Sequence, residues 1–545
     1  MDVKILSSLE KCFVDQSISD KVCLTHASAF KNERYSFQLA INSEIYTRRT
    51  LRLSIESEHA DKISVRRVRH IPVVAPVVGT RDANYVRTEP GIYPDLLEPF
   101  DTDCYFYVNG VTESFWFTAE GLPVGEHKIT INVTNGNGDT VIESASLTLD
   151  VIDALLPEQK LVATNWFHCD CLATYYDVEV FSERHWQIIE NFAKSYAENG
   201  LNLILTPILT PELDTAIGKE RPTVQLVDIK VTNGVYRYNF KKLDRWIEMC
   251  DRCGIKYFEM AHLFSQWGAK FCPKVMATVD GEYKRIFGWE TSSTGAEYKK
   301  FLRSFLNALV KHLKALGVDK RCFWHISDEP HGEEALKQYK ACRNIVKNIL
   351  KDYVVMDALS DFEFYKTGAV STPIPANTAI EPFIEANVPD LWVYYCCGQM
   401  VDVSNQFISM PSARNRVIAA QMYKYNIYGF LQWGYNFYYS QLSQYPINPY
   451  VINDSESAFS AGDPFKVYPA PNGKPLDSIR YVVFAEAMQD LRAMQLLESL
   501  TSRENVMAII EENSEITFSK FPHCPCYILS VREKINRAVE KALKK

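Results

Sequence analysis

The stretch CFWHISDEPHGEEALKQYK (322–340) contains a complete transition from a strand to a helix. Its first part, CFWHISD, is an apolar run of the length of a buried strand, and GEEALKQYK has the spacing of an amphipathic helix. Pro330 cannot donate a ladder hydrogen bond and disfavours a helical Glu329, so it marks the end of the strand. Asp328 and Glu329 therefore stand at the carboxyl end of a strand that a helix follows.

Apolar runs and amphipathic segments alternate on both sides of this stretch. The strands that we expect lie at 161–167, 201–208, 255–262, 322–328, 353–359, 391–397, 427–435 and 465–470. The helices that we expect lie at 181–200, 240–254, 297–317, 332–351, 413–426 and 478–500. Eight strands with intervening helices are typical of a (β/α)8 TIM barrel of class α/β, and a doubly wound sheet is the alternative. The least regular unit is 360–390, which is rich in proline and short of helix.

The sequence before residue 155 has a different pattern, with short alternating strands and no long helical segment. The strands that we expect there lie at 33–41, 103–110, 113–122, 127–135 and 144–154. Turn signals such as NGNGD (135–139) separate them, which is typical of a β-sandwich. We therefore expect an N-terminal β-sandwich at 1–157, a catalytic barrel at 158–500 and a C-terminal helical extension at 501–545.

The charge balance and the hydropathy limit the partners of the chain. It has 545 residues and a formal net charge of -8, which argues against a nucleic acid or an anionic membrane surface as its partner. The N-terminal stretch lacks the apolar core of a signal peptide, and no run reaches the roughly 18 apolar residues of a membrane span. We expect a cytoplasmic protein that acts on a small glycan or glycoside, and the sequence leaves open whether it forms a homo-oligomer.

The cysteine and glycine motifs give no sign of a metal or a cofactor. The 14 cysteines are unevenly placed, and without a secretion signal we expect free thiols. HCDC (168–171), CDRC (250–253) and HCPC (523–526) lack companions at the spacing of a four-ligand zinc site. No nucleophile elbow, P-loop or strand-linked dinucleotide-binding glycine motif is present. We therefore expect no metal and no cofactor.

Polar and aromatic side chains stand at the carboxyl ends of the expected strands, where a TIM barrel builds its active site. The candidates for substrate contacts are Asn165, His168, Asp214, His262, His325, Tyr395, Gln432, Trp433, Tyr435 and Asn436. Such a set favours a sugar pocket, and the alternative is that strand ends become polar because they reach the surface. For the two histidines at 262 and 325, contacts with sugar hydroxyls compete with a structural role.

Three of these candidates have a specific alternative. Trp433 is expected to form an apolar floor under the sugar, and core packing is its alternative. Tyr395 is expected to donate its hydroxyl to the substrate, but Tyr394 competes because neighbouring strand residues face opposite sides. Asp214 and Arg221 lie in one long loop, where pairing with each other competes with a contact to substrate.

The adjacent carboxylates Asp328 and Glu329 favour one kind of hydrolysis. Two neighbouring acids in a pocket repel each other's charge, so one proton is held more tightly, as a general acid requires. Neighbouring residues do not easily occupy opposite sides of an anomeric carbon, as the two carboxylates of ordinary retaining glycosidases do. They suit substrate-assisted hydrolysis, in which a 2-acetamido group of the substrate is the nucleophile. The alternative is a solvated loop acid next to an acid at a helix N-terminus.

Several long motifs carry a resemblance to a known family. They are HISDEPH (325–331), NWFHCDCLATYY (165–176), TPILTPELDTAIGKERPTVQLVDI (206–229), FEMAHLFSQWGAK (258–270), GFLQWGYNFYYS (429–440) and YPAPNGKPLDSIRY (468–481). Together they resemble glycoside hydrolase family 123, over roughly 160–495. The resemblance implies an N-terminal β-sandwich, a catalytic barrel and substrate-assisted retention. By position it implies that Glu329 is the general acid/base and that Asp328 positions the acetamido group.

The sequence thus predicts a retaining glycosidase that releases a terminal β-linked 2-acetamido sugar, with N-acetylgalactosamine favoured. A glycosidase of the same fold without an acetamido requirement, with inversion of the anomeric configuration left open, is one alternative. A non-catalytic carbohydrate-binding protein is the other. The preference at C4 of the sugar, the aglycone and the natural glycan are not readable from the sequence.

Overall fold

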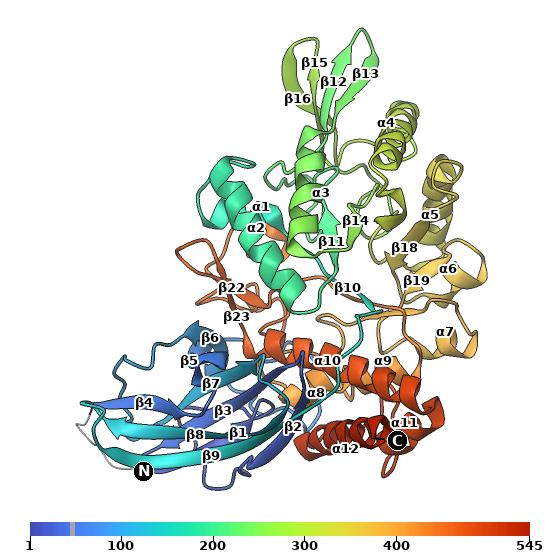
Figure 1. The fold of residues 1–545 in the computed structure, drawn as a ribbon. Helices are drawn as coiled ribbons and strands as arrows, with labels where there is room; N and C mark the ends of the chain where they lie inside the picture. Colours follow the sequence, from blue (N-terminus) through green and yellow to red (C-terminus); the bar gives the residue numbers. More distant parts are fainter. Residues whose placement is uncertain (44–49, 545) are drawn as a thin grey trace.

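Two β-sheets at the N-terminus pack face to face in the computed structural model, which describes residues 1–43 and 50–544 (Figure 1). One sheet has the order β1 (Asp2–Ser7), β3 (Arg34–Asn42), β7 (Thr112–Glu120), β5 (Ile63–Val73) and β6 (Gly91–Pro99). The other has the order β2 (His26–Phe30), β9 (Val141–Ile152), β8 (Gly125–Asn135) and β4 (Leu51–Glu56). Alternate residues of both sheets, such as Phe115 and Ile131, form their shared core. We call this part the N-terminal sheets.

Four of the five expected strands of this region are present, and one is not. Residues 103–110 contain isolated bridge positions, among them the bridge between Phe106 and Leu51, in place of the expected strand. The side chain of Phe106 is nevertheless buried in the core of the sheets, against Phe115. The apolar pattern therefore predicted burial correctly at Phe106 but not the ladder.

Parallel strands and helices alternate through the rest of the chain, which gives a mixed α/β fold. One parallel sheet has the order β10 (Val162–Asn165), β21 (Gly429–Gln432) and β20 (Trp392–Tyr394). The other has the order β11 (Leu203–Thr206), β14 (Tyr257–Met260), β17 (Cys322–Trp324), β18 (Val354–Ala358) and β19 (Thr372–Ile374). The amide of Asn202 donates to the Ala163 carbonyl at one junction of the two sheets, and Ala376 bridges Tyr394 at the other.

Seven of the eight expected strands of this part match parallel strands, and the eighth was misplaced. Residues 465–470 contain β22 (Val467–Pro469), which pairs antiparallel with β23 (Pro475–Asp477) in a separate ribbon. The remaining parallel strand is β19, inside the proline-rich unit 360–390. Its sequence TPI lacks the length and the apolar run that identify a buried strand, because Pro373 and Pro375 interrupt it.

Helices flank the parallel strands, as the sequence predicts, and a small sheet projects beyond them (Figure 1). They are α1 (Cys169–Tyr175), α2 (Glu183–Glu198), α3 (Lys241–Cys253), α4 (Ala296–Ala315), α5 (Gly332–Val346), α6 (Phe362–Lys366), α7 (Glu381–Glu385), α8 (Ser412–Arg416), α9 (Ile418–Lys424) and α10 (Ile479–Leu500). Helix α3 ends at Gly254, whose φ of 84° supplies the left-handed C-cap. The projecting sheet has the order β13 (Val235–Asn239), β12 (Asp228–Thr232), β15 (Val275–Val279) and β16 (Glu282–Phe287).

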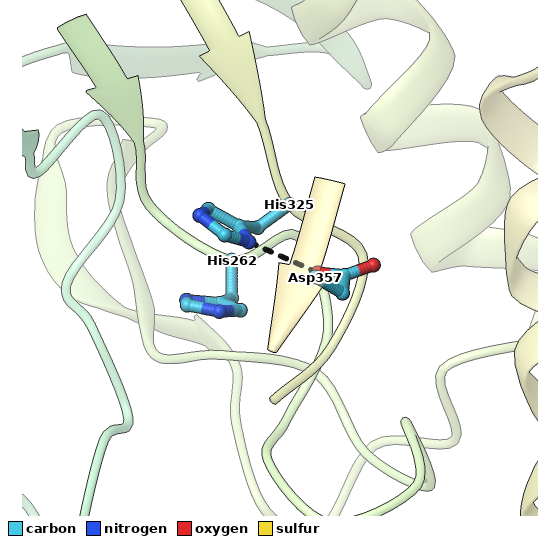
Figure 2. A group of neighbouring side chains, drawn as sticks. All are labelled: His262, His325 and Asp357. Carbon is cyan, nitrogen blue, oxygen red and sulfur yellow. Dashed lines mark hydrogen bonds and ion pairs between the residues drawn. The ribbon is translucent and has the colours of Figure 1, made fainter. Parts of the chain in front are cut away.

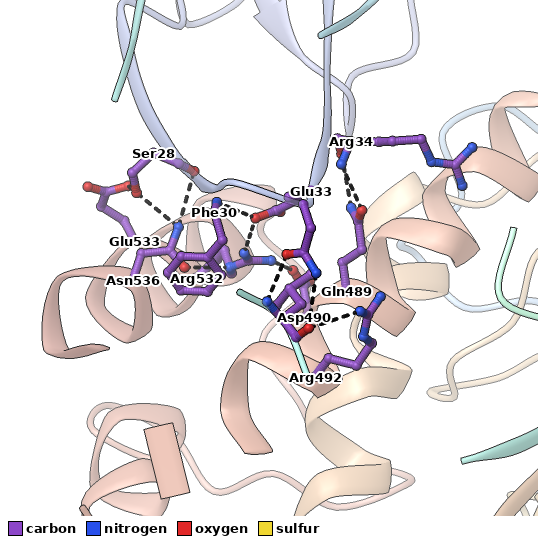
Figure 3. Close-up of polar contacts among 12 residues, drawn as sticks. Ser28, Phe30, Glu33, Arg34, Gln489, Asp490, Arg492, Arg532, Glu533 and Asn536 are labelled. Carbon is purple, nitrogen blue, oxygen red and sulfur yellow. Dashed lines mark hydrogen bonds and ion pairs between the residues drawn. The ribbon is translucent and has the colours of Figure 1, made fainter. Parts of the chain in front are cut away.

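The C-terminal helices join the N-terminal sheets to the rest of the molecule. Helices α11 (Arg503–Ile510) and α12 (Pro525–Leu543) pack on α10, and α12 also contacts β2. At this contact the buried guanidinium of Arg532 donates to Glu33 over 2.6 Å and to Asp490 over 2.9 Å (Figure 3). Arg416 donates to the same Asp490 and to Glu486. This buried network of ion pairs connects residues near the N-terminus of the chain with residues near its C-terminus.

One expectation about the cysteines is corrected. Cys524 and Cys526, in HCPC, form a disulfide at the N-terminus of α12, whereas the sequence predicts free thiols throughout. The other cysteines are free. No helix in the described part of the chain is long and apolar enough to cross a membrane.

Candidate active site

A cavity of about 750 Å³, open to solvent, lies at the carboxyl ends of the parallel strands. Segments that follow β10, β11, β14, β17, β20 and β21 all contribute to its wall, although they are far apart in the sequence. The lining side chains are Trp166, Leu213, Asp214, Gln266, Trp267, Asp328, Glu329, Ala358, Tyr394, Cys396, Cys397, Leu431, Trp433, Gln441, Leu442 and Phe459. The cavity lining combines apolar and indole rings with three carboxyl groups, as small-ligand sites do.

Asp328 and Glu329 both face this cavity, but their surroundings differ. Asp328 is only 8% exposed, whereas Glu329 is exposed to solvent. Burial and the neighbouring charge of Glu329 raise the pKa of Asp328 well above its ordinary value. Glu329 has a φ of 40°, and its amide donates to the Ala358 carbonyl, so the backbone turns sharply at the pair. The two carboxyl groups therefore share one cavity, but Asp328 is buried and Glu329 is exposed to solvent.

Tyr394 is the tyrosine of β20 that reaches this pair. Its hydroxyl donates to Oε1 of Glu329 over 2.5 Å. Tyr395, the candidate from the sequence, points to the opposite side, where it packs on Phe430 and its hydroxyl donates to Asn415. The structure therefore corrects the register, since Tyr394 lines the cavity and Tyr395 belongs to the core.

A buried ionic triad lies among the strands that carry the pair. His325 contacts Oε1 of Glu259 over 2.8 Å through Nε2. Through Nδ1 it contacts Oδ1 of Asp357 over 3.0 Å, as Figure 2 shows. Burial by itself lowers the pKa of His325, but the hydrogen bonds to Asp357 and Glu259 outweigh burial and raise it to about 10. Glu259 also accepts from Nε1 of Trp166, which lines the cavity. His325 thus does not itself line the cavity, and Glu259 links it to the lining residue Trp166.

His262 stacks on His325, with ring centroids 4.3 Å apart (Figure 2). Both of its ring nitrogens are buried and lack a hydrogen-bond partner in the described part of the chain. Burial, together with the positive charge of His325, lowers the pKa of His262 well below its ordinary value. His262, His325 and Asp357 offer donor atoms within 4.8 Å of one another. Because both nitrogens of His325 are bonded to carboxylates and the two rings are stacked, this arrangement suits an ion pair better than a metal centre.

The loop after β11 brings Asp214 to the cavity, but its expected partner lies elsewhere. Arg221 forms a two-pronged ion pair with Asp170, through bonds of 2.8 and 2.7 Å, and contacts Nδ1 of His168. The expected pairing of Asp214 with Arg221 is therefore absent. Asp214 instead accepts from the Leu442 amide. Burial raises the pKa of Asp214 to about 6, although that amide and Arg221 oppose the shift.

The strand β21 and the segment after it supply one cavity residue among the four candidates there. Trp433 lines the cavity, and its Nε1 donates to Oδ2 of the buried Asp463 over 2.7 Å. Gln432 donates to the Asp463 carbonyl, and Tyr435 donates to the carbonyl of Phe192 in the core. These contacts orient the strand end and leave Trp433 as its indole wall.

The remaining candidates are buried behind the wall. Asn436 brackets His168 by accepting from its amide and donating to its carbonyl. His168 also contacts the Trp433 carbonyl through Nε2, and burial lowers its pKa to about 3. Asn165 is not part of the cavity lining, and its buried side-chain amide group has no hydrogen-bond partner among the described residues. Four of the candidates, Asp214, Asp328, Glu329 and Trp433, therefore meet in one cavity.

Several lining residues were not among the candidates. Trp267 is 48% exposed beside the pair, and its amide donates to the Asp328 carbonyl. Gln266 precedes it, and the adjacent cysteines 396 and 397 follow Tyr394. Gln266 and Trp267 lie four and five residues beyond the expected strand 255–262, and Cys396 and Cys397 are the last two residues of the expected strand 391–397. Their one signal in the sequence is this closeness to a strand end.

The chain that forms this cavity is similar to a known protein family and to solved structures. The model of a family described as glycoside hydrolase 123, catalytic domain, matches residues 166–497. The structure of a family 123 glycoside hydrolase from Clostridium perfringens, described for glycolipid glycan hydrolysis, is similar with a TM-score of 0.75 and 15% identity, over 100% of this chain and 98% of that one. A GH5 xyloglucanase from Bacteroides ovatus matches with 8% identity and a TM-score of only 0.30, over 85% of this chain and 98% of its own. No curated protein sequence matches the chain.

Proposed function

Because the chain belongs to glycoside hydrolase family 123 and is a glycosidase, we propose that it releases a terminal β-linked 2-acetamido sugar, with N-acetylgalactosamine favoured, by a retaining, substrate-assisted route. The observation that carries the proposal is the adjacent pair of carboxyl groups in one cavity, with Asp328 buried and Glu329 exposed. The glycolipid glycan hydrolysis described for the relative from Clostridium perfringens supports a glycan substrate.

The proposed roles follow from the different surroundings of the two acids. Asp328 accepts a hydrogen bond from the acetamido N–H, which strengthens the acetamido oxygen as the nucleophile that attacks the anomeric carbon. Glu329 gives a proton to the leaving oxygen and later takes one from the water that opens the cyclic intermediate. Tyr394 holds the Glu329 carboxyl in place for this transfer.

The protonation of the pair couples to substrate binding. In the empty cavity the raised pKa of Asp328 favours its neutral form. An acetamido N–H that donates to Asp328 stabilises the carboxylate instead. Binding of the acetamido group therefore favours loss of the proton from Asp328. In the proposed mechanism, the more buried of the two acids is thus the one that orients the nucleophile.

Two indole rings and one further acid complete the proposed sugar site. Trp433, held by Asp463, presents an apolar surface to the sugar or to its acetamido methyl. The exposed Trp267 at the same cavity offers a surface for the aglycone. Asp214, which lines the cavity from the loop after β11, accepts hydrogen bonds from sugar hydroxyls.

We further propose that the eight parallel strands form a closed (β/α)8 barrel. The backbone bond between Asn202 and Ala163 and the bridge between Ala376 and Tyr394 support closure, because they lie at the two junctions between the sheets. The domains that we propose are an N-terminal β-sandwich at 1–157, the barrel at 158–500 and a helical extension at 501–545. The location of all lining segments at the carboxyl strand ends agrees with the catalytic face of such a barrel.

The experiment that tests the proposal measures the anomeric configuration of the first product from an aryl β-N-acetylgalactosaminide by NMR. We expect the β-anomer first and inhibition by a thiazoline that mimics the cyclic intermediate. In the variant E329Q, we expect the rate on substrates with poor leaving groups to fall by about 10²- to 10⁴-fold, because general acid catalysis is lost. An α-anomer as first product, or no effect of the thiazoline, would exclude the substrate-assisted route.

A further inference from the structure

Two adjacent cysteines in the cavity wall have no part in the proposed reaction. Cys396 and Cys397 lie two and three residues after the end of β20, are half-buried, and both line the cavity that holds the acidic pair. Their Sγ atoms are 4.0 Å apart, and neither cysteine is in a disulfide. Two thiols that face one another in a solvent-accessible cavity form a ready pair of donors for a thiophilic ion.

The geometry of the pair favours chelation over a disulfide. Consecutive Cα atoms are about 3.8 Å apart across a trans peptide, whereas a disulfide usually spans about 4.4 to 6.8 Å between Cα atoms. A disulfide also requires the sulfurs to approach to about 2.05 Å. Two bonds of about 2.3 Å to a tetrahedral ion, by contrast, hold the sulfurs about 3.8 Å apart. The separation of 4.0 Å already nearly matches that of a chelating pair.

The charge of the cavity favours a cation. Among the residues that the structure describes, its lining includes the carboxyl groups of Asp214, Asp328 and Glu329 and no lysine, arginine or histidine. The hydrogen bond with Cys397, burial and the charge of Glu329 raise the pKa of Cys396 well above its ordinary value. A divalent cation that replaces both thiol protons removes this unfavourable concentration of negative charge. The affinity for the ion therefore rises with pH, because two protons leave when it binds.

We propose that Cys396 and Cys397 form a binding site for one thiophilic divalent cation, Zn²⁺ or Cd²⁺, within the catalytic cavity. The two thiols lose their protons, two metal–sulfur bonds form, and water occupies the remaining positions of the ion. No electrons are transferred, so no oxidant is needed. The bound ion takes up space beside Glu329 and blocks entry of the glycoside, so that hydrolysis stops reversibly while the site is occupied.

The test begins with direct binding of Cd²⁺ to the full-length protein, without substrate. The background variant C23S/C104S removes the two exposed free thiols. Added Cd²⁺ should produce the ultraviolet thiolate-to-cadmium band at one ion per chain, and the band should be lost in the same background with C396S/C397S added. The control C253S removes the half-buried thiol of the CDRC motif on α3 and should keep the band. A band that survives C396S/C397S would overturn the site.

The second arm measures hydrolysis of any glycoside that the enzyme cleaves. Cd²⁺ should abolish the activity of the background variant, and a chelator should restore it fully. The remaining activity of C397S, a single change at a half-buried position, should be less sensitive to Cd²⁺ even if the double variant folds poorly. Equal sensitivity of C397S and the background would overturn the proposal. Because the ultraviolet band needs no substrate, it is independent of which sugar the enzyme takes.

Discussion

Tyr394 is the side chain on which the position of the Glu329 carboxyl depends most directly. Its hydroxyl is the group that donates to Glu329, over 2.5 Å. We predict that Y394F lowers kcat/KM by about tenfold or more, since a hydrogen bond to a charged group contributes about 1.5 to 3 kcal/mol. Y395F is the matched control, because that hydroxyl bonds Asn415 in the core. An effect of Y395F on kcat/KM as large as that of Y394F would contradict the assignment.

At the scale of single residues, the sequence predicts which residues belong near the site better than it predicts where each side chain points. The acidic pair was predictable because Pro330 fixes the strand end and two adjacent carboxyl groups are rarely placed in a pocket without a use. The choice between Tyr394 and Tyr395 was not, because a shift of one residue along a three-residue strand reverses which side chain faces the cavity. The pairing of Arg221 with Asp170 was hidden because Asp170 belongs to α1 and Arg221 to the loop between β11 and β12.

The loop between β11 and β12 depends on one buried ion pair. Arg221 donates twice to Asp170 and once to the Leu213 carbonyl, next to Asp214 in the cavity wall. We predict that R221M lowers the free energy of unfolding by about 3 to 5 kcal/mol, because it leaves Asp170 buried without its partner. It should also raise KM, because Leu213 and Asp214 lose their support. Urea unfolding and initial rates measure the two effects.

The control for this loop is R285M. Arg285 pairs with the half-exposed Glu220 and the exposed Glu290, and such pairs contribute about 0 to 1 kcal/mol. If R221M proves no more destabilising than R285M, the buried pair does not hold the loop.

Among the elements, periodicity identified the long ones and failed on the short ones. Helices such as α4 and strands such as β11 follow from their apolar spacing alone. The strand β19 did not, because three residues with a proline carry no period, and its place is set by hydrogen bonds to β18. The ribbon residues 465–470 resemble a parallel strand in composition, and only their partner β23 distinguishes them.

The ionic network that joins the two ends of the chain includes Glu486, a carboxyl group whose pKa is raised. Glu486 accepts from Ser8 and Arg416, and burial raises its pKa from 4.5 to about 7. The native state therefore keeps a proton that the unfolded chain releases between these values, so its stabilising effect is lost as pH rises through about 7. The loss amounts to about 3 kcal/mol at most.

We predict that the stability of E486Q, whose side chain at 486 cannot titrate, increases relative to that of the native protein as pH rises. The difference in the free energy of unfolding between the two proteins, measured by urea at about pH 5 and about pH 8, should move toward E486Q across this window. A difference that is the same at both pH values would show that Glu486 does not titrate there.

At the largest scale, the order of sheet-rich and helix-rich regions was readable from the sequence, but their contacts were not. Glu33 and Arg532 are ion-paired although 499 residues separate them. Each looks like an ordinary surface charge in its own segment, because burial arises only when α12 packs on β2 (Figure 3). The lining of the cavity has the same origin, since the strand ends that form it converge only in the folded chain.

The most direct test of the account compares the native enzyme and D328N on matched aryl β-glycosides of N-acetylgalactosamine and galactose. If Asp328 orients an acetamido nucleophile for Glu329, kcat/KM for the acetamido substrate should fall by about 10²- to 10³-fold in D328N. The rate on the galactoside, which has no acetamido group to orient, should change far less. An equal loss on both substrates, or an unchanged rate on the acetamido substrate, would contradict the claim that the two acids act together on one bound 2-acetamido sugar.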